Sequence, residues 1–299
     1  MCGIVGLFLK DPKLEPALGA LLAGMLFPLS ERGPDSTGFA VYGNSRDGHS
    51  KLTLRGPVGT DFGALAAQIT NRLGDVVPVV RRDTHAVVSV PNGQVNEARK
   101  ILSTIAPEIT IVGTGRRMEL YKEVGLPSEV ANRFELAGMA GTHAIGHTRM
   151  ATESAVTIDG AHPYSTAPDQ CLVHNGSLSN HNSVRRELIR DGITFSTEND
   201  TEVAAGYLTW RLRHGMDLNT ALQATLKDLD GFYTFVVGTE SGFGVLRDPI
   251  ACKPAVMVET ESYVAFGTEY RALVDLPDVE HGRVFEPEPA KVYFWELRH

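Results

Sequence analysis

The pattern of apolar and polar positions predicts strands toward both ends of the chain and helices between them. The apolar run at residues 3–9 has the length of a buried strand, and the leucines of residues 16–29 recur at the spacing of a helix that buries one face. Further strands are predicted at residues 39–42, 144–148, 171–174, 233–239, 244–247, 255–259, 263–268 and 292–295. Further helices are predicted at residues 184–191, 201–214 and 218–228. This arrangement indicates sheets packed on each other with helices outside.

Residues 44–137 follow a different pattern, in which short strands and helices alternate. Strands are predicted at 52–54, 86–90 and 109–112, helices at 62–73 and 95–105, and a mostly helical segment at 121–134. We therefore expect one domain over residues 1–299 that contains a small α/β insertion at 44–137. The turn at residues 113–117 could bind an anion at the start of a helix. A plain turn is favoured, because a full phosphate-loop signature is missing.

Composition and charge exclude several functions. A net charge of −8 argues against a nucleic-acid-binding surface, which needs a basic face. No apolar run reaches the ~18 residues of a membrane helix, and the N-terminus does not have the pattern of a signal peptide. The three cysteines are too few and too scattered for a disulfide framework or a zinc site, so no metal is expected. A reducing, cytoplasmic location fits this composition.

The second residue is the first candidate for chemistry. Removal of Met1 would leave Cys2 with a free α-amino group, so that one residue would carry both a nucleophile and the base that takes its proton. The sequence does not show whether Met1 is removed. The alternative is an ordinary residue at a frayed terminus.

Two polar pairs downstream would complete a site for amide hydrolysis. Asn175 and Gly176 follow a predicted strand and could supply a side-chain amide and a backbone N–H to a tetrahedral oxyanion; the alternative is an Asn-Gly hairpin turn. Arg149 could bind the α-carboxylate of an amino acid, or be a solvated surface arginine. Asp200 could bind the α-ammonium group, or cap the helix that follows it.

These segments together resemble the class II glutamine amidotransferases, the glutaminase type of the N-terminal-nucleophile hydrolases. The resemblance covers residues 2–43 and 138–275 and implies an α+β fold, a four-layer αββα sandwich of two antiparallel sheets flanked by helices. The matching motifs occur in the family's order: CGIVG at 2–6, RGPDSTG at 32–38, HTR at 147–149, AHP at 161–163, HNG at 174–176, DTE at 200–202, RDP at 247–249 and GTE at 267–269.

The resemblance implies a role for each matched position. L-Glutamine would be the substrate, Cys2 the nucleophile with its own α-amine as base, and Asn175 with Gly176 the oxyanion hole. The remaining implied roles belong to Arg149 at the α-carboxylate, Asp200 at the α-amine, Thr152 in the glutamine pocket and Arg32 as structural support. Met150 and Glu153 depart from the residues that many relatives have there, which leaves the details of the pocket open.

The chain carries no motif of a second synthase domain, so we expect a glutaminase subunit whose ammonia is used on another chain. It resembles the amidotransferase subunit of N-methylglutamate synthase and of split glutamate-synthase-like enzymes. This resemblance implies two partners, a flavin-bearing synthase subunit and a glutamate-synthase-like β-helix subunit. It also implies that FMN is on a partner subunit, with or without an iron–sulfur cluster. The alternatives are another glutamate-synthase-like complex, a terminal-cysteine hydrolase of bile salts or penicillin-like amides, and a catalytically silent scaffold subunit.

Overall fold

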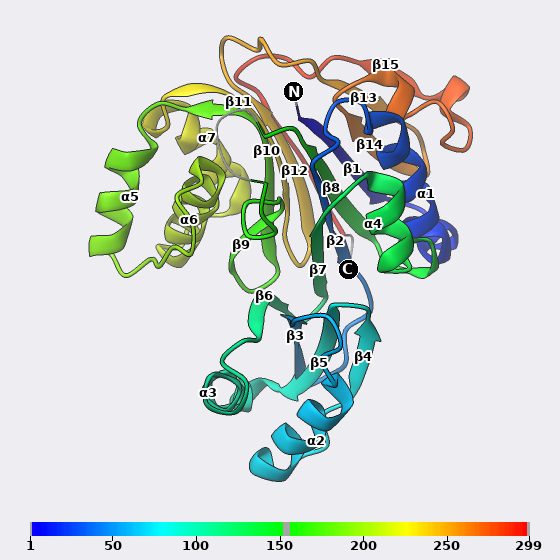
Figure 1. Cartoon of the computed structure of the whole chain (residues 1–299). Coiled ribbons are helices and arrows are strands. Elements are labelled where there is room, and N and C mark those ends of the chain that lie inside the picture. The colour runs from blue at the N-terminus through cyan, green and yellow to red at the C-terminus, as the bar shows by residue number, and fades with distance from the viewer. Residues whose placement is uncertain (1, 152–155, 298–299) are drawn as a thin grey trace.

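The computed structural model describes residues 2–151 and 156–297, which form two facing sheets, outer helices and a small appended unit (Figure 1). Within these residues, one sheet has seven strands in the spatial order β15 (Arg283–Phe285), β13 (Val256–Glu259), β14 (Tyr263–Gly267), β1 (Gly3–Leu9), β8 (His143–Arg149), β2 (Ser36–Tyr42) and β7 (Met118–Val124). The facing sheet of the described chain has five, in the order β16 (Val292–Glu296), β12 (Gly242–Arg247), β11 (Gly231–Gly238), β10 (Gln170–Leu178) and β9 (Tyr164–Ala167). Paired strands in both sheets run antiparallel.

Helices cover the outer face of each sheet. The helix α1 (Leu18–Leu26) and the helix α4 (Pro127–Arg133) pack on the seven-stranded sheet, and α5 (His181–Arg190), α6 (Asp200–Arg213) and α7 (Leu218–Asp228) pack on the five-stranded sheet (Figure 1). The predicted αββα sandwich is therefore confirmed. Short 3-10 turns complete the described chain: η1 (Pro12–Ala17), η2 (Phe27–Leu29), η3 (Asn92–Gln94), η4 (Leu136–Gly138), η5 (Tyr270–Ala272) and η6 (Val279–His281).

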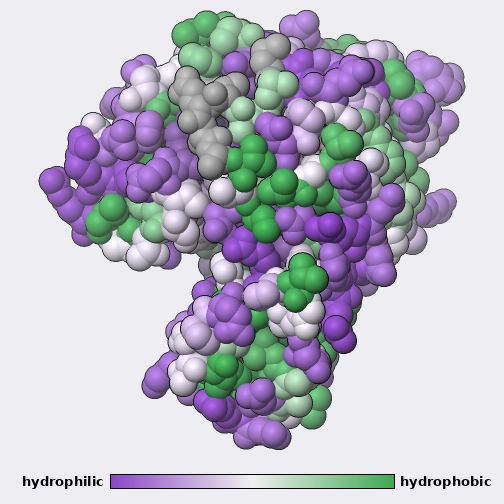
Figure 2. Space-filling model, in the orientation of Figure 1, coloured by the Kyte–Doolittle hydropathy of each residue, from purple (hydrophilic) through white to green (hydrophobic). Residues whose placement is uncertain are grey.

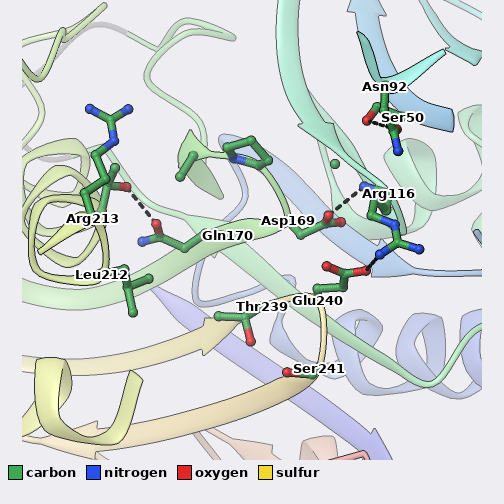
Figure 3. Close-up of a pocket in the computed structure, with 14 residues that line it drawn as sticks. Ser50, Asn92, Arg116, Asp169, Gln170, Leu212, Arg213, Thr239, Glu240 and Ser241 are labelled. Atoms are coloured by element: carbon green, nitrogen blue, oxygen red, sulfur yellow. Dashed lines mark hydrogen bonds and ion pairs between the residues drawn. The ribbon is translucent and has the colours of Figure 1, made fainter. Parts of the chain in front are cut away.

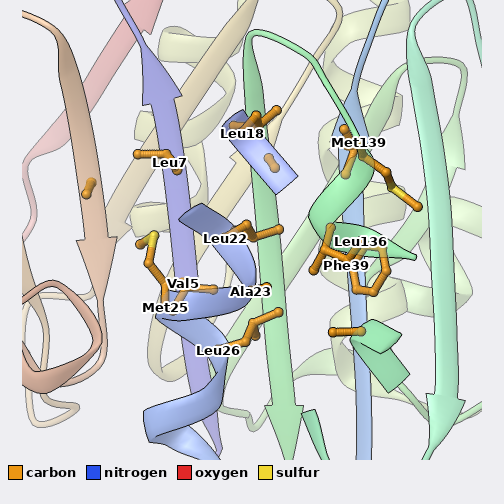
Figure 4. Close-up of a cluster of buried hydrophobic side chains, with 14 of the residues drawn as sticks. Val5, Leu7, Leu18, Leu22, Ala23, Met25, Leu26, Phe39, Leu136 and Met139 are labelled. Atoms are coloured by element: carbon orange, nitrogen blue, oxygen red, sulfur yellow. The ribbon is translucent and has the colours of Figure 1, made fainter. Parts of the chain in front are cut away.

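Strand β1 is apolar throughout because both of its faces are buried. Val5 and Leu7 point to the layer under α1, where they meet Leu22, Leu26 and Phe39 (Figure 4). Ile4 and Phe8, on the other face, join the layer between the two sheets. Burying side chains of this size contributes roughly 1.5–3 kcal/mol each. The double burial explains why the strand that begins at Gly3 reads as a continuous apolar run rather than as an alternating one.

The appended unit has its own sheet and core. Its strands lie in the order β4 (Val79–Arg82), β5 (His85–Pro91), β3 (His49–Arg55) and β6 (Thr110–Gly115), and α2 (Phe62–Leu73) and α3 (Val95–Ile105) pack on one face. We call this unit, residues 49–115, the insertion. It projects below the two sheets in Figure 1. The face seen in Figure 2 is largely hydrophilic, with apolar residues gathered near its centre. No helix of the described residues combines the length and apolarity needed to cross a bilayer.

The end of the predicted 44–137 range belongs to the main body. Strand β7 pairs with β2 along its whole length, and α4 packs near α1. The prediction of a mostly helical segment at 121–134 is therefore wrong for residues 121–124, which belong to β7. The reason is that Leu120 is buried between the sheets and Tyr121 on the opposite face, so the strand lacks the alternation that would identify it.

Residues 113–117 form the end of β6 and the turn that leads to β7 in the seven-stranded sheet, rather than the start of a helix, and amides of this turn bind a carboxylate of the chain itself. Asp169, buried and with φ of +52°, accepts hydrogen bonds from the backbone N–H of Arg116 at 2.6 Å and of Arg117 and Met118 at 2.9 Å each. A side chain at Gly115 would collide with it, since an added Cβ would lie 2.2 Å from Asp169 Oδ1. The anion-binding amides are thus already occupied.

We predict that Asp169→Ala lowers the free energy of unfolding by about 3 kcal/mol, because three backbone donors lose an ionised acceptor. Asp169→Asn keeps one acceptor oxygen and tolerates the left-handed backbone, so it should lose only about half as much. Urea unfolding of the three proteins measures the difference. Equal losses in the two variants would show that the carboxylate contributes nothing specific.

Candidate active site

Cys2 lies at the start of β1, in the middle of the seven-stranded sheet, and is partly exposed. Its carbonyl oxygen accepts a hydrogen bond from Arg32 Nε at 3.3 Å, and Arg32 also forms an ion pair with Glu269. Two residues on, Ile4 N donates to Thr268 Oγ1 at 2.8 Å and Thr268 N donates to the Ile4 carbonyl at 3.0 Å. Cys2 is therefore anchored to its neighbours rather than at a frayed end, and Arg32 makes the contact that a supporting role requires.

The turn that contains Arg32 lies directly on the end of β8. An added Cβ at Gly33 would lie 2.3 Å from the carbonyl carbon of Thr148, so the two backbones touch. Asp35 N donates to the Arg149 carbonyl at 3.1 Å, and Asp35 Oδ2 accepts from Ala151 N at 2.7 Å. The backbone on both sides of Arg149 is thus fixed by this turn.

Arg149 ends β8 and is buried, with 6% of its surface exposed. The alternative of a solvated surface arginine is therefore wrong. The residues that lead into β9 lie next to the Arg149 guanidinium. An added Cβ at Gly160 would lie 3.3 Å from Arg149 Nη1. Thr152, which was predicted to line the glutamine pocket, lies outside the described residues, as does Glu153.

Asn175 and Gly176 lie inside β10, opposite Thr234 and Tyr233 of β11, so the alternative of a hairpin turn is wrong. Gly176 has φ of +150°, and an added Cβ would lie 1.9 Å from the Phe232 carbonyl oxygen, so the position excludes a side chain. Asn175 is buried, and its Nδ2 has no hydrogen-bond partner among the described residues. A buried donor without a partner costs roughly 1–3 kcal/mol, and this one is available to a ligand.

The backbone at Gly176 offers a second hydrogen-bond donor to a ligand. Tyr233, opposite Gly176, donates its N–H to Asp248 Oδ1 at 3.1 Å and accepts from Asp248 N at 2.9 Å, on the side away from β10. By the alternation of an antiparallel pair, the N–H of Gly176 then turns away from β11. It shares that side with the Leu178 N–H, which donates to Asp200 Oδ2 at 2.9 Å.

Asp200 is the first residue of α6 and does not cap it. The cap is Asn199, whose Oδ1 accepts from Thr201 N at 2.8 Å, so the capping alternative for Asp200 is wrong. Glu202 shapes the loop before the helix, accepting from Ser196 N and Thr197 N at 2.7 Å each. Asp200 is thus held beside the end of β10, and its Oδ1 lies 3.8 Å from His174 Nδ1.

Three buried histidines behind these groups form a cluster that the sequence analysis did not assign. His147 Nε2 donates to the His174 carbonyl at 3.1 Å, which joins β8 of one sheet to β10 of the other. The rings of His147 and His162 stack with centroids 3.9 Å apart. Thr201 Oγ1 lies 2.7 Å from His162 Nε2 and 3.0 Å from His174 Nδ1. The only sequence signal was a histidine in each of three separate motifs.

Burial keeps this cluster uncharged at neutral pH. It lowers the pKa of His147 to about 3, and it lowers the pKa values of His162 and His174 as well, with Asp200 opposing the effect at His174. The Nδ1 of His147 has no partner among the described residues, so the ring uses Nε2 as its donor. Neutral rings let the cluster pack in the interior without a buried charge.

Comparison with known proteins agrees with this geometry. Residues 147–275 match the glutamine amidotransferase domain family. The chain is 59% identical over 297 residues to the glutamine amidotransferase-like protein GlxB of Rhizobium meliloti (strain 1021), covering 99% of this chain and 98% of that protein. It is 33% identical over 304 residues to a putative glutamine amidotransferase of Methanothermobacter thermautotrophicus, covering 98% and 99%. The chain belongs to the class II glutamine amidotransferase family.

A solved structure shows the same fold. The glutamine phosphoribosylpyrophosphate amidotransferase from B. subtilis, complexed with ADP and GMP, superposes with a TM-score of 0.63 at 20% sequence identity. The superposition covers 99% of this amidotransferase and 47% of the longer chain. The likeness shows that the sandwich fold is shared.

Three cavities of this amidotransferase lie away from Cys2. One of about 580 Å³ lies between the insertion and the five-stranded sheet, where Arg116 and Glu240 form an ion pair at 3.3 Å near Asp169 and Gln170 (Figure 3). Another, of about 540 Å³, lies between the insertion and residues 158–159. The third, of about 1250 Å³, lies at the opposite end of β1. Within the described residues, no group of three or more His, Cys, Asp or Glu side chains could hold a metal ion.

We predict that the histidines make the protein acid-labile. The folded pKa of His147 is below the unfolded value of about 6.5, so its contribution is fully present above that pH and is lost as pH falls toward 3. His147→Gln keeps a donor for the His174 carbonyl but cannot be protonated. Between pH 5.5 and 4, its free energy of unfolding should depend on pH less steeply than that of the wild type, by about 1.4 kcal/mol per pH unit. Parallel urea-unfolding series test this, and identical slopes would contradict it.

Proposed function

We propose that this amidotransferase hydrolyses L-glutamine to L-glutamate and ammonia through a γ-glutamyl thioester on Cys2. The observation that carries the proposal is the buried, unpartnered Nδ2 of Asn175, at a strand position beside Gly176 where no side chain fits. The N–H of Gly176 turns to the same side as Asp200, so two donors are available for an oxyanion. They cost no reorganisation when charge develops, because β10 already fixes them.

The proposed reaction gives Cys2 both the nucleophile and the base. With Met1 removed, the α-amine of Cys2 takes the thiol proton, and the thiolate attacks the carbon of the glutamine side-chain amide. The C–N bond breaks as the amine returns the proton to the leaving ammonia. Water then adds to the thioester, the C–S bond breaks, and glutamate leaves while the thiol is reformed.

The two ends of the amino acid are held by opposite charges. The buried guanidinium of Arg149 lies at the end of β8, one strand from Cys2, and would bind the α-carboxylate in bidentate fashion. Asp200 Oδ1, whose companion oxygen is already held by Leu178 N, would accept from the α-ammonium group. Bile salts and penicillin-like amides do not offer an amino acid's pair of α-carboxylate and α-ammonium groups, which disfavours them as substrates.

We predict that Cys2→Ala abolishes glutamine hydrolysis, because no other group in the site can form the thioester. Ammonia release from glutamine, measured by coupled oxidation of NADH, should fall to background. Cys252→Ala, which removes an exposed cysteine, is the matched control and should retain full activity. Residual hydrolysis in Cys2→Ala, or active protein that keeps Met1 by intact mass, would overturn the mechanism.

We predict that Asn175→Ala lowers kcat by roughly 10²–10³-fold, the effect of removing one oxyanion donor. Its melting temperature should not fall, because the amide nitrogen has no partner among the described residues to lose. Asn180→Ala is the contrast, since its side chain bonds to Asp228 and Asp230. It should lower stability and leave kcat nearly unchanged. A destabilised Asn175→Ala with normal kcat would make Asn175 a structural residue.

We further propose that the ammonia is used by a separate synthase, in a complex like that of N-methylglutamate synthase. The partners would be a flavin-bearing synthase subunit, with FMN and with or without an iron–sulfur cluster, and a glutamate-synthase-like β-helix subunit. The cysteines of this chain support placing any cluster on a partner, since Cys171 is buried against Tyr42 and Cys252 is on the surface. Affinity purification should bring down a chain with flavin absorbance. Isolation of a fully active glutaminase without such a chain would contradict this part.

A further inference from the structure

Residues 158–162, which lead into β9, are bound by a lysine of the seven-stranded sheet. Lys122 of β7 is buried, with 8% of its surface exposed, and its Nζ donates to the Ala161 carbonyl at 2.9 Å and to the Asp159 carbonyl at 3.3 Å. The ammonium also lies 4.8 Å from the centre of the Tyr164 ring. Among the described residues, no carboxylate oxygen lies within 4.0 Å of Lys122 Nζ.

A glycine makes room for this arrangement. Gly38 of β2 is opposite Lys122 in the sheet. An added Cβ there would lie 2.1 Å from the His162 carbonyl oxygen and 2.7 Å from Lys122 Cβ. The segment can therefore lie flat on β2 and β7, with its carbonyls toward the ammonium.

The insertion holds the same segment from the side. Arg55, at the end of β3, forms an ion pair with Asp159 through Nη2 and Oδ1 at 2.9 Å, and Tyr164 donates its hydroxyl to the Asp159 carbonyl at 3.2 Å. Asp159 is thus bound by the insertion, by β7 and by β9. One residue further, Gly160 lies next to the Arg149 guanidinium, since an added Cβ there would be 3.3 Å from Nη1.

We propose that Lys122 is a positioning residue of the glutamine site, which together with Arg55 of the insertion fixes residues 158–162 against the Arg149 guanidinium. The inference rests on the proposed function, because it assigns the affected group to the glutamine α-carboxylate. A buried lysine is costly, and a methionine of similar length would fill the space without that cost. Here the cost is offset by the hydrogen bonds of the ammonium to two backbone carbonyls of residues 158–162, which lie beside Arg149.

The charge of this lysine is sensitive to pH. Burial lowers the pKa of Lys122 to about 8; Asp159 and Glu202 oppose the shift, and Arg55 adds to it. Among the described residues, Tyr164, His85 and His162 also face the lysine from neighbouring elements. The wild-type protein should therefore show a rise in KM for glutamine as pH passes 8, where the ammonium becomes a neutral amine.

The test compares Lys122→Met and Lys122→Arg with Lys51→Met in the full chain. Lys51 is a matched control, because it is a half-buried lysine between the insertion and the main body that pairs with Glu119 at 2.7 Å. We expect Lys122→Met to raise KM for glutamine about tenfold with kcat within about twofold, as for a loss of ground-state binding. Lys122→Arg should recover most of the affinity, and Lys51→Met should keep the wild-type KM. The alkaline rise in KM should be absent from both Lys122 variants.

Two further measurements separate the possible failures. Glutamine binding to Cys2→Ala, with and without Lys122→Met, gives Kd by calorimetry without turnover. If Lys122→Met does not fold, Arg55→Gln decides, and it should raise KM about threefold. An unchanged KM in Lys122→Met overturns this inference but not the proposed glutaminase function. If Lys122→Met does not fold, an unchanged KM in Arg55→Gln has the same meaning. Wild-type protein that neither binds nor hydrolyses glutamine overturns the proposed function and the inference with it.

Discussion

The geometry of the site depends on the hydrogen bond that His147 Nε2 donates to the His174 carbonyl. Arg149 lies two residues beyond His147 on one sheet, and Asn175 follows His174 on the other. In the proposed reaction one substrate must meet both residues, so a slide of one sheet over the other would separate them. Close packing of the apolar side chains between the sheets resists such a slide. The directional bond of His147 adds to that resistance at the base of the site, as the Tyr42–Cys171 contact at 3.3 Å and the bond from His143 Nε2 to the Thr239 carbonyl at 2.8 Å do elsewhere.

The same region contains buried polar groups that lower the stability of the fold. Asn175 Nδ2 is buried without a partner in the described chain, and His147, His162 and His174 are neutral in a place where apolar residues would pack as well. Such groups lower stability unless they bind something. His147 lies two residues before Arg149 on β8, His162 stacks on His147, and Asn175 follows His174 on β10, so these groups lie around the proposed glutamine site. The stabilising layers lie elsewhere, under α1 and between α6 and β10.

The sequence predicted most of the scaffold, and the limits of its predictions have physical causes. Strand β1 and helices α2 and α7 match their predicted bounds, because an uninterrupted apolar run and a one-sided helical repeat have a single interpretation. Strand β7 was missed because Lys122 and Glu123 are buried polar residues inside it. At Asn175, Arg149 and Asp200 the residues alone left two alternatives, since only tertiary contacts separate a strand from a turn, a buried from a solvated cation, and a cap from its neighbour. The histidine cluster was beyond prediction, as it joins residues from three distant segments.

The insertion is built into the site rather than attached beside it. Thr53 Oγ1 of β3 accepts from Leu120 N of β7 at 3.3 Å, and the Arg55–Asp159 ion pair joins the same unit to the residues before β9. Because Leu120 and Lys122 are on one strand, movement of the insertion would be transmitted through β7 to residues 158–162. A partner that bound the insertion could therefore change the affinity of the proposed site for glutamine without contacting that site. In the proposed complex with a synthase, such binding would couple partner contact to glutamine hydrolysis.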